Sequence, residues 1–99
     1  MSDKEFVKKY LEDFSVLAKP DQEIIEKITK IKDILIDTKK SNSKTLIFGN
    51  GGSAAIASHV SIDLTKNAKI KCTNYNEADL ITCFSNDYGF ERWIEKTID

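Results

Sequence analysis

Apolar residues recur at helical spacing through the first forty residues of the chain. Between Asp3 and Ala18 they repeat every three or four positions, at Phe6, Tyr10, Phe14 and Leu17. Lys19-Pro20-Asp21 interrupts the pattern, because proline disfavours helical backbone in the residue before it. A second stripe then runs to about residue 40, through Ile24, Ile28, Ile31 and Leu35. The pattern predicts two amphipathic helices.

These two stripes carry more apolar surface than the short strands that follow them could cover. We expect part of this surface to be buried against another subunit. A helical pair within one chain fits the same pattern equally well.

The pattern changes at Thr45. Residues 45–48 and 70–75 are rich in β-branched and aromatic side chains, as buried parallel strands are. Between them, the stretch from Ser53 to about residue 66 has helical spacing, with Ile56, Val60 and Leu64 as its core stripe. A strand, a helix and a strand form a right-handed crossover by default. The fold class is therefore α/β with a parallel sheet.

The last part of the chain predicts a short helix over 77–85, a break at 86–89, and another helix over 90–99. The final apolar pattern has no stop signal, and two parallel strands alone leave both faces of a sheet uncovered. We therefore expect the chain to be the front part of one longer domain. In this interpretation residues 1–42 form a helical oligomerisation segment, and residues 43–99 begin the sheet.

Composition narrows the classes of partner. The 99 residues carry 15 Lys and Arg against 16 Asp and Glu, a net charge of -1, which argues against a broad nucleic-acid or anionic-membrane surface. No apolar run approaches the roughly 20 residues of a membrane span, so a cytoplasmic protein is expected. Cys72 and Cys83 have no second pair and indicate neither a disulfide framework nor a zinc knuckle. We expect both to be reduced core residues.

A glycine-rich turn joins the first predicted strand to the next helix, in the run Gly49-Asn50-Gly51-Gly52-Ser53-Ala54-Ala55. Free backbone N–H groups at such a helix start favour a phosphate or sugar hydroxyls. The spacing also satisfies a permissive dinucleotide fingerprint, with Glu77 as the candidate ribose acid, although Asn76-Glu77 is more typical of a helix start. No lysine follows the glycines, which excludes a Walker loop. The alternative is a tight turn that binds nothing.

His59 and Asp63 lie four residues apart on the helix after the turn, so they share a face. An imidazole beside a carboxylate is able to bind a metal or to move a proton. The alternative is an ordinary ion pair at the edge of a helix.

Three motifs in order then resemble one family. Residues 49–55, the histidine and carboxylate at His59 and Asp63, and the run Asn86-Asp87-Tyr88-Gly89-Phe90 look like those of the sugar isomerase (SIS) domain family, closest to the phosphoheptose isomerases. The similarity extends over all 99 residues and covers about the first half of a family member. It implies a doubly wound parallel sheet with flavodoxin-like layering, preceded by two helices that help to build a homotetramer.

The resemblance also implies an activity and a site. The reaction would be the aldose–ketose isomerisation of sedoheptulose 7-phosphate to a manno-heptose 7-phosphate, an entry step to the heptose of bacterial lipopolysaccharide. Substrate contacts would fall to Asn50, Gly51, Gly52, Ser53, Asn86 and Asp87. His59 and Asp63 would be zinc ligands, and Asp63 would also be a candidate catalytic base.

The chain departs from the family pattern in two respects. The family usually has Glu where this chain has Asp63, and it takes its main phosphate loop and further metal and acid–base residues from its second half. The 99 residues alone are therefore expected to be inactive. Two other functions stay open: a non-catalytic SIS module that binds a sugar phosphate or a protein partner, and, more distantly, a dinucleotide-binding protein.

Overall fold

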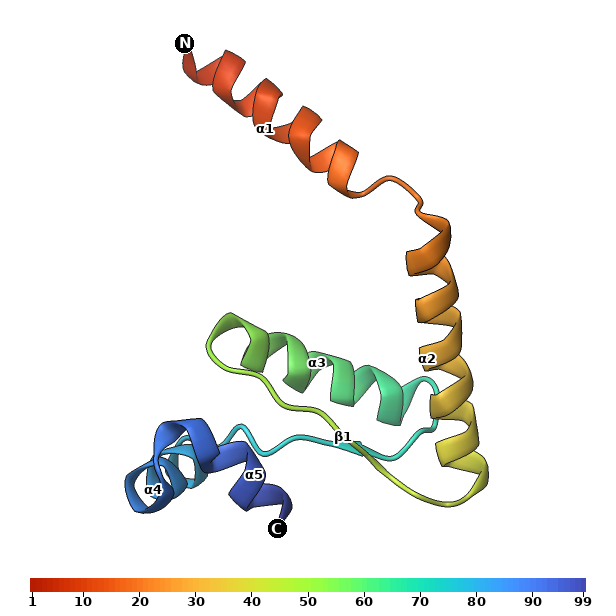
Figure 1. Cartoon of the computed structure of the whole chain (residues 1–99), viewed down its shortest axis with the longest axis vertical. Helices are drawn as coiled ribbons and strands as arrows, with labels where there is room; N and C mark the ends of the chain where they lie inside the picture. Colours follow the sequence, from red (N-terminus) through yellow and green to blue (C-terminus); the bar gives the residue numbers. More distant parts are fainter. The chain divides into compact units, whose positions relative to one another are not determined.

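The computed structural model describes residues 1–99, which form two compact units, Met1–Asp33 and Ile34–Asp99 (Figure 1). The second helix belongs in part to each unit. In chain order the elements are α1 (Asp3–Leu17), α2 (Gln22–Lys40), β1 (Thr45–Leu46), α3 (Gly52–Lys66), β2 (Cys72–Thr73), α4 (Ala78–Tyr88), the 3₁₀ turn η1 (Phe90–Arg92) and α5 (Trp93–Ile98).

The first unit confirms the two predicted helices. A capping box starts α1, in which Ser2 and Glu5 each bind the other's backbone N–H. Asp21 caps α2, where its carboxylate accepts a hydrogen bond of 2.8 Å from the N–H of Glu23. Neither stripe is buried within this unit, since Phe14 is 60% and Ile28 61% exposed. The intramolecular helical pair is therefore not formed, and burial against another subunit stays a prediction.

The second unit confirms the α/β crossover. Strands β1 and β2 pair in parallel, with Thr45 opposite Cys72 and Leu46 opposite Thr73, and α3 connects them. Two ladder bonds involve residues next to these pairs, from the N–H of Thr45 to the carbonyl of Lys71 at 2.8 Å and from the N–H of Ile47 to the carbonyl of Thr73 at 3.0 Å. The strands are shorter than predicted, because each has only the other as a partner. The doubly wound sheet is not formed by these residues and remains a prediction.

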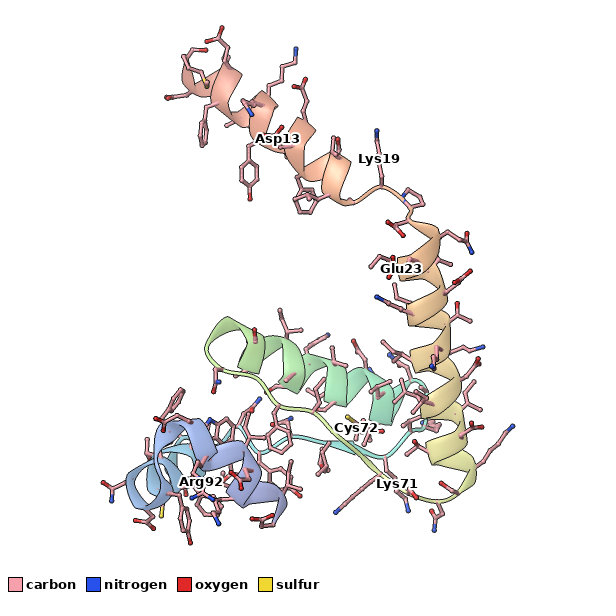
Figure 2. All side chains as sticks on the ribbon, in the orientation of Figure 1. Asp13, Lys19, Glu23, Lys71, Cys72 and Arg92 are labelled. Carbon is pink, nitrogen blue, oxygen red and sulfur yellow. The ribbon has the colours of Figure 1, made fainter.

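The core of this unit lies where the two strands meet α3 and α5. Its buried apolar residues are Ala57, Ile70, Cys72 and Trp93. Trp93 is 1% exposed and meets the ring of Phe48 edge-on, with ring centres 5.9 Å apart. Lys71 and Cys72 show the alternation of a strand, since Lys71 is exposed and Cys72 is buried (Figure 2).

The C-terminal elements differ from the predictions in two details. Helix α4 continues to Tyr88, so Asn86 and Asp87 form its last turn and do not break it; Gly89 ends it with a φ of 93°. Cys83 is exposed on α4, so the prediction of a core position was wrong for it and right for Cys72. None of the helices is long and apolar enough to cross a membrane.

Candidate functional site

The glycine turn requires glycine at two positions, for different reasons. A Cβ at Gly49 would collide with the backbone carbonyl of Ser53 and would lie 2.8 Å from the nitrogen of Ala54. Gly51 has a φ of +56° and a ψ of -124°, a backbone conformation that disfavours residues with side chains. The first turn of α3 therefore packs directly against the backbone of Gly49.

The same turn leaves backbone donors free. The N–H of Ser53 is bonded to the carbonyl of Asn50 at 3.0 Å, and that of Ala54 to the carbonyl of Gly51 at 3.1 Å. The N–H groups of Gly51 and Gly52 have no acceptor in the protein, and the side chain of Ser53 is exposed. Unpaired amides at a helix N-terminus suit an anion, and the phosphate site expected here stays a prediction.

His59 and Asp63 lie next to each other on α3 and face solvent. Their Nε2 and Oδ2 atoms are 3.5 Å apart, and their side chains are 75% and 52% exposed. Such exposure makes the pair weak as a structural ion pair. At 1.5 Å per residue, His59 lies about 9 Å along the helix from Ser53.

The residues present do not form a metal site by themselves. No group of three or more His, Cys, Asp and Glu side chains stands close enough to hold a metal ion. A catalytic zinc ion takes three protein ligands and a structural one four, whereas His59 and Asp63 supply two. Residues 1–99 would therefore need at least one donor from elsewhere.

Asn86 and Asp87 lie exposed in the last turn of α4 and are bonded locally. Asp87 accepts from the amide of Asn86 at 3.4 Å and from the thiol of Cys83 at 3.7 Å. No hydrogen bond joins them to the glycine turn. Glu77 caps α4 in an extended conformation, as its helix-start sequence indicated, and does not end a strand.

Sequence reasoning missed a polar cluster at the carboxyl end of β2. Asn74 donates to Ser61 at 2.9 Å, and Asn76 donates to the carbonyl of Ala54 at 2.8 Å and to the hydroxyl of Ser58 at 3.0 Å. One asparagine near the end of the predicted strand 70–75 and another directly after it were the available signal. Only the fold shows that Ser58 and Ser61 meet Asn76 and Asn74.

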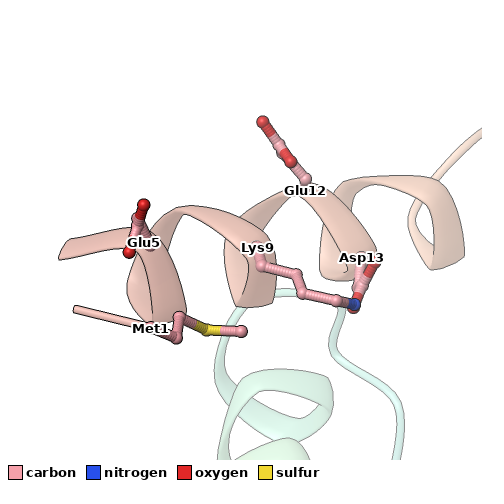
Figure 3. A pocket seen from close by; sticks show the side chains of 5 residues that line it. All are labelled: Met1, Glu5, Lys9, Glu12 and Asp13. Atoms are coloured by element: carbon pink, nitrogen blue, oxygen red, sulfur yellow. The ribbon is translucent and has the colours of Figure 1, made fainter. Parts of the chain in front are cut away.

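A hollow lies on α1, far in sequence from the residues described so far. It is a shallow, charged depression on one helix, and the salt bridge between Lys9 and Asp13 spans part of it at 2.7 Å (Figure 3). The side chains that line it are those of Met1, Glu5, Lys9, Glu12 and Asp13. It contains none of the predicted site residues.

Comparison with known proteins points to one group. No family model and no solved structure matches the chain. The phosphoheptose isomerase of Trichlorobacter lovleyi is 32% identical in an alignment that is 101 residues long. This alignment covers 95% of this chain and 52% of that protein. That of Aliarcobacter butzleri is 29% identical over 94% of this chain and 52% of its own length. The chain spans about half the length of the curated relatives that it matches, and it is similar to phosphoheptose isomerases over nearly all of its own residues.

Proposed function

We propose that the full-length protein is a sugar-phosphate aldose–ketose isomerase that converts sedoheptulose 7-phosphate to a manno-heptose 7-phosphate. The observation that carries the proposal is the alignment with a phosphoheptose isomerase, which covers 95% of this chain at 32% identity. The free amides of Gly51 and Gly52 support it, because they suit the phosphate of such a substrate. Residues 1–99 would contribute this phosphate-binding turn and part of the catalytic set.

Isomerisation through an enediol needs a base that removes a proton from the carbon beside the carbonyl and returns it one carbon away. Asp63 is the proposed base, since a carboxylate is able to accept that proton and this side chain is 52% exposed. His59 lies within 3.5 Å and would orient that carboxylate or share its proton. The phosphate, held at the turn and at the main phosphate loop expected from the second half, would supply remote binding energy that keeps the sugar in register.

Zinc remains a proposal on His59 and Asp63, and it requires further donors from outside residues 1–99. Asn50, Ser53, Asn86 and Asp87 are proposed substrate contacts. A cytoplasmic homotetramer built through residues 1–42 is proposed as well, supported by the exposed apolar stripes of α1 and α2. Analytical ultracentrifugation of the full-length protein would measure its mass and test the tetramer.

The decisive experiment assays the purified full-length protein with sedoheptulose 7-phosphate, with and without added zinc. We expect turnover, and we expect Asp63→Ala and His59→Ala each to lower kcat by about 100-fold or more. Lys66→Ala, on the same exposed side of α3, is the matched control and should leave kcat unchanged. Failure to interconvert any heptose or hexose phosphate would overturn the proposal.

A non-catalytic SIS module is the second candidate, favoured by the short carboxylate at position 63. Losing one methylene draws a carboxylate back by about an ångström, and such a displacement is able to cost about 100-fold in rate. Asp63→Glu separates the two candidates. A gain of turnover indicates an enzyme with a weakened base, whereas no turnover with retained sugar-phosphate binding indicates a binding module.

A further inference from the structure

Two asparagines at the carboxyl end of β2 reach the same helix one turn apart. Asn76 donates its amide hydrogens to the carbonyl of Ala54 and to the hydroxyl of Ser58, at 2.8 and 3.0 Å. Asn74 donates to the hydroxyl of Ser61 at 2.9 Å. Asn76 is thus bonded to the first turn of α3, and Asn74 to the middle of the helix.

The orientation of the Asn76 amide is fixed by its partners. The carbonyl of Ala54 only accepts hydrogen bonds, so the nitrogen of the amide must face it. The oxygen Oδ1 consequently lies on the other side, where it is buried without a donor. An unpaired buried oxygen is destabilising. What this amide contributes must therefore lie in its two donated bonds.

One of those bonds reaches the glycine turn through a single residue. Ala54 accepts from Asn76 with its carbonyl, and its own N–H is bonded to the carbonyl of Gly51 at 3.1 Å. Gly49 has no room for a Cβ against this same turn of helix. A shift of Ala54 would therefore move the amides of Gly51 and Gly52.

We infer that Asn76 is a positioning residue for the glycine turn: it fixes the first turn of α3 to β2 and so holds the free amides in the geometry that binds a phosphate, without touching the ligand. The inference rests on the proposed function for its ligand and on the hydrogen bonds for its mechanism. Asn74 donates a bond of similar length to α3 one helical turn further from the glycines, so that donated bond should not have this role. The oxygen of its side chain accepts from the backbone N–H of Asn76 at 3.3 Å, so a control variant must keep that oxygen.

The test compares Asn76→Ala, Asn76→Asp and the matched control Asn74→Asp in the full-length protein. Both aspartate variants keep the shape of the side chain and remove its N–H donors, and Asn74→Asp keeps the oxygen that accepts from the N–H of Asn76. With sedoheptulose 7-phosphate as substrate, we expect both Asn76 variants to raise KM by about five- to tenfold, the effect of losing one or two net hydrogen bonds, with kcat within about twofold. Asn74→Asp should leave KM within about twofold.

Amide hydrogen exchange reports on the turn without any substrate. Exchange at Ser53, Ala54 and Ala55, whose N–H groups are bonded to the carbonyls of Asn50 and Gly51, should speed up by about five- to tenfold in both Asn76 variants and not in Asn74→Asp. Ser58→Ala removes only one of the two acceptors, so it should give a smaller change in the same direction. This milder variant keeps the test decisive if an Asn76 variant fails to fold.

The outcomes separate this inference from the proposed function. Faster exchange at the turn in a protein without isomerase activity would support the positioning role and overturn the proposed function alone. Wild-type exchange and KM in Asn76→Asp would overturn the positioning role. Equal losses in Asn74→Asp would also overturn it, since they would show a general loosening of α3.

Discussion

The two units of the chain use apolar residues in opposite ways. In Met1–Asp33 the large apolar side chains stand exposed along two regular helices, and no residue of α1 is buried. In Ile34–Asp99, by contrast, four apolar residues are buried: Ala57, Ile70, Cys72 and Trp93. A regular apolar stripe on a helix therefore predicts that this face is buried against another surface, but it does not predict that this surface lies in the same unit.

Stability should accordingly depend far more on the second unit than on the first. We expect Trp93→Ala to lower the free energy of unfolding by about 3–5 kcal/mol, because it empties the best-buried position of the core. Phe14→Ala, at a 60% exposed aromatic residue, should change it by no more than about 0.5 kcal/mol at protein concentrations low enough to keep the chain monomeric. Urea unfolding followed by far-UV circular dichroism measures both values.

The contrast between the two units would be wrong if Trp93→Ala and Phe14→Ala lowered the free energy of unfolding equally. A loss of several kcal/mol in Phe14→Ala would mean that the α1 stripe is covered in solution. Dependence of that loss on protein concentration would then identify a second copy of the chain as the cover.

The glycine turn gives the next largest effect, and it has a control within itself. Gly49→Ala should cost about 1–3 kcal/mol, because its Cβ has no space against the backbone of Ser53 and Ala54. Gly52→Ala lies in the first turn of α3 with nothing within 4 Å, so it should be neutral or stabilising by up to about 1 kcal/mol. Thermal unfolding measures both. Equal destabilisation by the two variants would contradict the close approach at Gly49.

The two cysteines sharpen the contrast between buried and exposed positions in one unit. Burial raises the pKa of the Cys72 thiol, so less thiolate is present at neutral pH, whereas Cys83 is exposed on α4. Alkylation by iodoacetamide at pH 7.5 should therefore modify Cys83 about tenfold faster than Cys72. Mass spectrometry of the tryptic peptides follows each site, and urea should abolish the difference. Equal rates in the folded protein would show that Cys72 is accessible.

The sequence predicted the elements of this molecule better than its contacts. Local periodicity predicts both N-terminal helices and the parallel crossover. The glycine turn could be predicted because its backbone conformation and close approach suit only glycine. The exposure of Cys83 could not be predicted, because a one-residue difference on a short helix decides which face it occupies. Nor could the bonds from Asn76 to α3, because they join residues 18 and 22 positions apart. How α1 and α2 are covered is likewise not encoded in their own stripes.

The smallest expected effect lies at the start of α1, in the unit without a core. Hydrogen bonds from the backbone N–H and the hydroxyl of Ser2 lower the pKa of the Glu5 carboxyl below its usual 4.5. This group therefore stabilises α1 fully above pH 4.5, and the contribution is lost as the pH falls through the lowered value. Glu5→Gln keeps a side chain that suits a capping box but does not titrate. The difference in helical circular dichroism between wild type and Glu5→Gln should consequently change on acidification from pH 7 to 3, and a flat difference curve would show that the capping box does not form in solution.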